Sequence, residues 1–207
     1  AGGGSRRISM GPLHAAAFKK LNSIVKIDLL SSEDPLRIIE IWMEYHSQHK
    51  SACAGVLTKA ELDAIHFRAQ KCPTLLLPVA KAGGGYFVLA AQYAAPSQEG
   101  TGVVALPSSA PKWFLTPLDD FRLNPDAAEA VFGISVHTEL IDSKDLALAR
   151  ADFYDGGMIS KAAAEKLLRD LFFCYWDTAA FKDVQKMNHS GGAFEWEAFA
   201  QKMLSRE

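Results

Sequence analysis

The residues whose types and spacing could support chemistry are few, and the first group is a histidine pair. His46 and His49 are three residues apart, with Cys53 nearby. Imidazole and thiolate groups are common ligands of zinc. No fourth ligand follows at a recognisable spacing, and residues 48–54 have the composition of a loop. We interpret the pair as the solvated end of a helix and predict no metal site.

Other features that are typical of active sites are incomplete. The glycine run 83–85 has the composition of a phosphate-binding loop, but a phosphate loop precedes a helix, and here a strand-like run follows. The adjacent carboxylates Asp119 and Asp120 would project about 100 degrees apart on a helix and would not meet at one substrate atom. Cys174 lies in an aromatic helical run without a base to activate it. The sequence therefore predicts no enzyme, no ATP hydrolysis and no bound cofactor.

The composition is that of a globular protein, with 49% hydrophobic and 22% charged residues in a chain of 207. Five of the 22 basic residues precede the first acidic residue, Asp28. The remaining 17 basic against 24 acidic residues give a formal charge of −7, which argues against nucleic-acid binding. The longest strongly apolar stretch, residues 72–79, is too short to cross a bilayer, so we predict no membrane insertion. Three scattered cysteines favour a reducing compartment.

The acid-free N-terminal segment has two interpretations. Residues 1–11 are predicted to be disordered, and the arginines among small residues resemble the end of an organelle transit peptide. The same composition also fits a flexible tail or, for residues 1–5, a cloning remnant. From residue 12 onward we see no domain boundary, and we predict a single domain over residues 12–207.

Helices are predicted at the N-terminal end of this domain. In residues 12–22, Leu13 and Leu21 recur on one face of an amphipathic helix, with Phe18 beside them. A lone domain need not bury this face completely. We therefore regard these three residues as candidates for binding a partner.

Two further helices have local start signals. An extended or irregular apolar connector over residues 23–30 leads to a helix for which Ser32 is the predicted N-cap. Thr58 and Glu61 form a capping box at the start of the next helix. That helix is expected to end before Pro73.

The middle of the chain changes to the period of strands. Residues 74–79 and 86–93 are apolar runs on either side of the glycine-rich turn 81–85, which predicts a hairpin. A short helix is expected over residues 117–123. The other strand-like runs are 102–106, 112–116, 130–140 and 146–154, the last two joined by the turn 142–145. Such short connections cannot hold the crossover helices of parallel strands. We therefore predict an α+β fold with a central antiparallel meander sheet of about five or six strands.

The C-terminal third returns to the period of helices. Ser160 is the predicted N-cap of a helix that runs to Trp176, and two shorter helices follow it. The core-facing stripe of the first helix leaves an aromatic surplus of Phe172, Phe173 and Trp176. The last helix could cover this surplus, or the surplus could form an exposed patch that binds a partner.

Four stretches in a fixed order resemble one protein family. They are residues 21–30 followed by Ile41-Trp42 and Tyr45-His46; Cys72-Pro73 before residues 75–78, with Gly85-Tyr86-Phe87; Phe114-Leu115-Thr116 with Leu118 and Phe121; and residues 137–140 before the strand-like run 146–153. Together they cover about residues 20–176. The ordered set resembles the chaperones that assemble the catalytic head of the mitochondrial ATP synthase.

The resemblance implies a function. A member of this family would bind the unassembled beta subunit of the head and shield its interface until the alpha subunit displaces it. It would act in the mitochondrial matrix, or in another organelle such as a plastid, would need no cofactor and would be monomeric when free. No contact residue carries over from the family, and the tail after Asp177 matches less clearly. The candidate partner-binding residues are therefore Leu13, Phe18, Leu21, Phe172, Phe173 and Trp176.

Two other hypotheses stay open at this point. The chain could be a permanent structural subunit of an organelle complex built on the same fold, because the same interface chemistry serves a transient or a lasting partner. It could also be an enzyme with an unrecognised site. Native gel migration would separate a chaperone in small, transient complexes from a subunit that co-migrates with the full assembly, and affinity purification from the organelle would identify the dominant partner.

Overall fold

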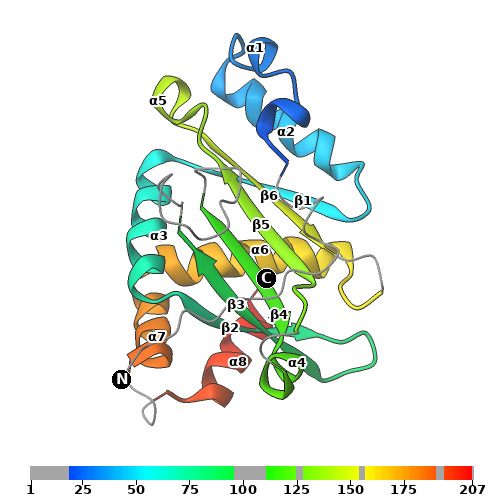
Figure 1. Ribbon diagram of the computed structural model, residues 1–207, viewed down its shortest axis with the longest axis vertical. Helices are drawn as coiled ribbons and strands as arrows, with labels where there is room; N and C mark the ends of the chain where they lie inside the picture. The colour runs from blue at the N-terminus through cyan, green and yellow to red at the C-terminus, as the bar shows by residue number, and fades with distance from the viewer. Residues whose placement is uncertain (1–18, 96–110, 125–127, 154–156, 190–193, 207) are drawn as a thin grey trace.

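The computed structural model describes residues 19–95, 111–124, 128–153, 157–189 and 194–206. They form an α+β fold around a six-stranded antiparallel sheet with the strand order β1-β6-β5-β4-β3-β2 (Figure 1). The strands are β1 (Ala52–Leu57), β2 (Thr74–Ala80), β3 (Tyr86–Ala94), β4 (Lys112–Pro117), β5 (Phe132–His137) and β6 (Ala147–Phe153). Strands β2 to β6 follow one another as a meander, and β1 adds to the outer side of β6. The predicted fold class is confirmed.

The tight connections in the meander follow from local backbone preferences. Between β2 and β3, Gly84 and Gly85 have φ angles of 93° and 73°, a region that glycine enters without steric cost. Lys81 N donates to Gly85 O at 3.0 Å and closes the hairpin. Between β5 and β6 lies the short helix α5 (Ile141–Lys144), followed by Asp145 in the left-handed conformation. Both turns join neighbouring antiparallel strands, as the sequence predicts.

Strand β1 is the main element that sequence reasoning missed. Residues 48–54 were predicted as a loop, but Ala52–Leu57 pairs with β6 along its whole length. From β1, helix α3 (Lys59–Lys71) carries the chain to β2 at the opposite edge of the sheet. A helix of 13 residues is about 20 Å long, close to the roughly 24 Å that six strands span. The crossing helix therefore matches the width of the sheet.

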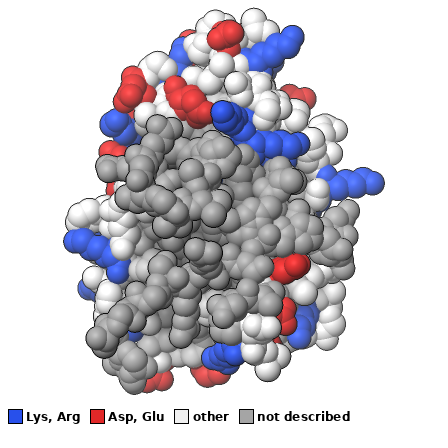
Figure 2. Space-filling view, viewed as in Figure 1, with Lys and Arg blue, Asp and Glu red and all other residues white. Residues whose placement is uncertain are grey.

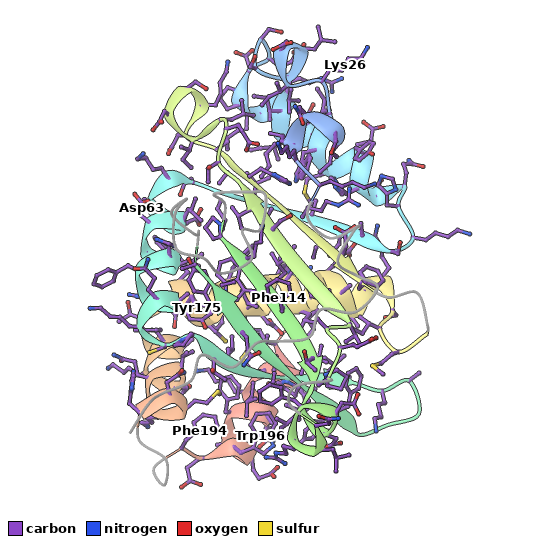
Figure 3. The ribbon with its side chains drawn as sticks, in the orientation of Figure 1. Lys26, Asp63, Phe114, Tyr175, Phe194 and Trp196 are labelled. Atoms are coloured by element: carbon purple, nitrogen blue, oxygen red, sulfur yellow. The ribbon has the colours of Figure 1, made fainter. Side chains whose placement is uncertain are left out.

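The main core lies between the sheet and the helices on one of its faces. These helices are α3, α6 (Lys161–Trp176), α7 (Thr178–His189) and α8 (Trp196–Ser205). Tyr175 of α6 is fully buried there, and its hydroxyl donates to Cys72 O at 2.8 Å (Figure 3). At the lower end of the view in Figure 3, Phe194 lies beside Trp196, with ring centroids 6.4 Å apart. The helical C-terminal third is thus part of the core.

A second apolar cluster lies on the other face, at the β1–β6 end of the sheet. Helix α2 (Pro35–Ser47) packs there through Ile38 and Trp42 against Leu148 of β6. The Trp42 indole is fully buried and donates to Ala149 O at 3.1 Å. The chain that leads to α2 contributes Leu21 and Leu30. Helix α2 is therefore packed on this face of the sheet, over β1 and β6.

Two of the three predicted helix starts are confirmed. Thr58 and Glu61 form the capping box of α3, and Ser160 Oγ accepts from Ala163 N at 3.2 Å. Ser32 is wrong as an N-cap, because its hydroxyl donates back to Leu29 O and the N-cap is Asp34. Pro35 occupies the first helical position and so moves the start of the helix beyond Ser32.

The segment before α2 also differs from its prediction. Residues 23–30 were expected to be extended or irregular, but they include the end of a 3-10 helix, η2 (Leu21–Ser23), and the helical turn α1 (Ile27–Leu30). The short helix after β4 is confirmed as α4 (Leu118–Leu123). The leader 1–11 and the strand-like run 102–106 lie outside the described residues.

The packing of α2 on the sheet gives a direct prediction for stability. Trp42→Ala should lower the free energy of unfolding by about 3–5 kcal/mol, because it removes a fully buried indole and its hydrogen bond. Leu36 lies on the same helix and is 76% exposed, so Leu36→Ala should change the free energy by less than about 0.5 kcal/mol. Urea denaturation followed by circular dichroism measures both. Equal and small effects would show that α2 is not packed on the sheet.

Candidate partner-binding groove

A groove with a volume of about 860 Å³ lies along β1, between α2, α3 and α6. Its floor is the middle of β1, residues 54–56, which are only partly buried, whereas both ends of the strand are buried. The apolar residues of its walls are Ile39 and Met43 of α2, Ile65 of α3, and Leu168, Phe172, Phe173 and Trp176 of α6. The groove is therefore mainly apolar and has an edge strand at its base.

The three aromatic residues singled out on α6 all line this groove, but they differ in exposure. Phe172 is buried, and its ring meets that of Trp113 edge-on at 6.0 Å. Phe173 is half-buried beneath the Arg206 guanidinium, which lies 3.5 Å from the ring centroid. Trp176 is 45% exposed. The core and the C-terminal residues thus cover most of the aromatic surplus and leave Trp176 open to a partner.

The N-terminal candidates are placed less favourably for binding. Leu21 is fully buried in the cluster beneath α2, so its observed role is packing. Leu13 and Phe18 lie outside the described residues. A role of these three residues in binding a partner stays a prediction.

A glycine in β1 shapes the floor of the groove. At Gly55, an added Cβ would lie 3.4 Å from Leu168 Cδ2 and 3.7 Å from Phe172 Cε2. The missing side chain therefore leaves the strand backbone bare on the side that faces α6. Gly55 is visible in the sequence, but its role in the groove could not be inferred because strand β1 was not predicted.

One lysine connects the elements that flank the groove. Lys161, the first residue of α6, donates its Nζ protons to the carbonyl oxygens of His46 and His49, and to that of Ala52 at 2.8 Å. It joins the C-terminus of α2 and the first residue of β1 to the start of α6. A cation at this position also interacts favourably with the carbonyl end of the α2 dipole.

His46, predicted to be solvated, is buried, and that prediction is wrong. Its Nδ1–H donates to Trp42 O at 2.8 Å, and its Nε2 accepts from Arg150 Nη1 at 3.3 Å. Arg150 Nε in turn donates to Asp152 Oδ2 at 2.8 Å. Burial lowers the pKa of His46 to about 4. The histidine is a neutral link between α2 and β6, which the local sequence could not show because Arg150 lies 104 residues away.

The described residues show no activated nucleophile in or near the groove. Burial raises the pKa of the Cys53 and Cys174 thiols to about 12. Cys72 Sγ lies 3.4 Å from His189 Nε2, a contact that sequence reasoning missed, but burial raises the pKa of this thiol as well. A protonated thiol is a poor nucleophile. Within the described ranges, no group of three or more His, Cys, Asp or Glu residues could hold a metal ion.

The described charges on the face in Figure 2 do not form a patch of one sign. Lysine, arginine, aspartate and glutamate side chains are interspersed, most densely at the top of the view, over α1, α2 and α5. The charged residues that line the groove are of both signs: Glu44, Glu61, Glu165, Arg169 and Arg206. No helix in the described part of the chain has the length and apolar character needed to cross a membrane.

The fold and the groove define an α+β domain with a recessed, mainly apolar surface along an edge strand. The family model described as ATP11 protein matches residues 10–195, and the chain belongs to this family. A curated relative, named as the ATP synthase mitochondrial F1 complex assembly factor 1 of Danio rerio, is 25% identical over 179 residues. That match covers 86% of this chain and 53% of the relative, so the chain spans about half of the relative's length.

The buried imidazoles predict how stability depends on pH. Burial lowers the pKa values of His46 and His137 to about 4, whereas an unfolded histidine titrates near 6.5. Between these values the unfolded chain binds protons that the folded chain does not, so stability falls as the pH drops from 6.5 towards 4. We expect a loss of up to about 2 kcal/mol per imidazole.

The variant His46→Gln tests this assignment. A glutamine can keep a neutral donor and a neutral acceptor near Trp42 O and Arg150, so the loss of stability between pH 6.5 and 4.5 should be shallower than in the original protein. Urea denaturation at several pH values measures the slope. An unchanged slope in His46→Gln would contradict a depressed pKa at His46.

Proposed function

We propose that this protein is an assembly factor of the ATP synthase catalytic head and acts by binding the unassembled beta subunit. Its membership of the ATP11 family is the observation that carries the proposal. The name of the Danio rerio relative supports a mitochondrial F1 assembly role, and the order of family-like stretches supports the beta subunit as the partner. The proposed place of action is the mitochondrial matrix.

The proposed action needs no chemical step. An unassembled subunit exposes apolar surface that its neighbours later bury, and a chaperone must cover this surface without holding it permanently. A groove with a few apolar anchors and a charged rim suits this task, because a few anchors provide most of the binding energy and the rest of the contact provides fit. In this proposal the alpha subunit displaces the chaperone when it occupies the same surface of beta.

The anchors of the groove give a test of this function. Trp176 and Met43 are 45% and 44% exposed on opposite walls, so replacing each by serine should leave the fold intact. We expect Trp176→Ser to weaken binding of the purified beta subunit at least tenfold, and Met43→Ser to weaken it severalfold, because both remove apolar contact area from the groove. Isothermal titration calorimetry measures the affinities, and thermal unfolding checks the fold.

The matched control is an exposed aromatic residue outside the groove. Phe67 of α3 is 58% exposed and does not line the groove, so Phe67→Ser should bind beta like the original protein. If all three variants bind beta normally, the groove is not the docking surface. If the original protein binds no beta subunit, the proposed function itself is wrong.

A further inference from the structure

We propose that the groove binds its partner as an extended strand that pairs with the free edge of β1. The main-chain groups of Ala54 and Val56 would exchange hydrogen bonds with a short apolar segment of the partner, which then becomes a seventh strand of the sheet. Only the identity of the partner as the beta subunit rests on the proposed function. The mode of binding rests on the strand itself.

The register of β1 shows which of its main-chain groups face outward. Phe153 N donates to Ser51 O at 3.0 Å, so residues 51 and 153 form a hydrogen-bonded pair. Such pairs alternate along an antiparallel ladder, so residues 53, 55 and 57 bond to β6. The N–H and C=O groups of Ala52, Ala54 and Val56 therefore point away from the sheet.

One of these outward residues is already engaged. Ala52 O accepts from Lys161 Nζ at 2.8 Å. In the described parts of the chain, no group bonds to the main-chain N–H or C=O of Ala54 and Val56. Polar main-chain groups at partly buried positions are costly to leave unpaired. A partner strand would pair with the outward main-chain groups of Ala54 and Val56 and keep them hydrogen-bonded when the groove is covered.

The sequence of β1 lacks the features that normally protect a free edge. Edge strands are usually blocked by charged side chains, proline or bulges. The strand Ala-Cys-Ala-Gly-Val-Leu has none of these, and its residues 52–55 are all small. Another backbone can therefore approach closely. The pattern is typical of a strand that accepts a neighbour by β-augmentation.

The walls define the chemistry of the strand that fits. Side chains of an extended chain alternate between the two faces of the sheet. One set would contact Ile39 and Met43 of α2, and the other set would contact Leu168, Phe172 and Trp176 of α6. These contact residues on both walls are apolar and lie within a charged rim, so the occupant is a run of about four or five consecutive apolar residues, as in a strand buried on both faces. A subunit segment that becomes buried after assembly has this composition.

The same walls argue against a second copy of this chain as the occupant. Figure 1 shows β1 at the sheet edge, with α2 beside it and α6 crossing behind the strands. A second copy would bring its own α2 and α6 to the shared edge. The recess therefore admits one extended chain and excludes another sheet flanked by helices.

Amide hydrogen exchange on the full chain tests the pairing residue by residue. On addition of the purified beta subunit, the amides of Ala54 and Val56 should become at least tenfold better protected. The amide of Gly55 already bonds to β6 and should change little. This alternation is specific to strand pairing, because side-chain docking over the groove would protect neighbouring amides alike.

A proline variant provides the matching affinity measurement. Ala54→Pro removes an outward N–H without removing a bond to β6, whereas Ala54→Ser keeps the N–H and a small side chain. We expect Ala54→Pro to weaken binding of beta at least tenfold and Ala54→Ser less than twofold, with circular dichroism confirming that both fold. If Ala54→Pro does not fold, the exchange experiment on the original chain decides.

Each outcome separates the mode of binding from the function. If beta binds and the Ala54 and Val56 amides stay unprotected, strand pairing is wrong and the proposed function stands. Protection that rises with protein concentration in the absence of beta would assign the edge to a second copy and overturn the inference. If beta does not bind at all, the proposed function is wrong, and so is the beta subunit as the source of the added strand.

Discussion

The pairing of β1 with β6 is the interaction on which the rest of the structure depends. It joins the first of the described strands to the last, so helix α2 before β1 and helix α6 after β6 come to the same edge of the sheet. Trp42 fixes α2 on one face, and Lys161 ties the end of α2 and the start of β1 to α6. The groove is the space that these two helices leave beside the edge strand. Without this pairing, α2 and α6 would not lie on either side of β1.

Local signals in the sequence were sufficient for much of the fold. The Thr58 capping box, the Ser160 cap and the glycine hairpin each act over a few residues, and the structure contains all three. Strand β1 was missed because its small residues carry no alternation of polar and apolar side chains. Its strand conformation comes from pairing with residues about 100 positions later. A single sequence gives no local sign of such a partner.

Only part of the candidate site was predicted, because its geometry also depends on residues that are distant in the sequence. The aromatic surplus on α6 was visible as a helix with more large apolar residues than one face can bury. Its division into buried Phe172, half-covered Phe173 and exposed Trp176 depends on Trp113 and Arg206, which are distant in sequence. The burial of His46 likewise depends on Arg150 of β6. The sequence could identify the residues, but only the fold shows which surface they share.

The proposed docking of the unassembled beta subunit in the groove along β1 predicts direct contact between the two proteins. Site-specific photo-crosslinking tests it most directly, with a photoreactive side chain placed either at Met43, on a groove wall, or at Leu123 of α4, which is 85% exposed and does not line the groove. We expect a covalent adduct with purified beta from position 43 and none from position 123. Adducts from position 123 alone, or equal yields from both positions, would contradict it.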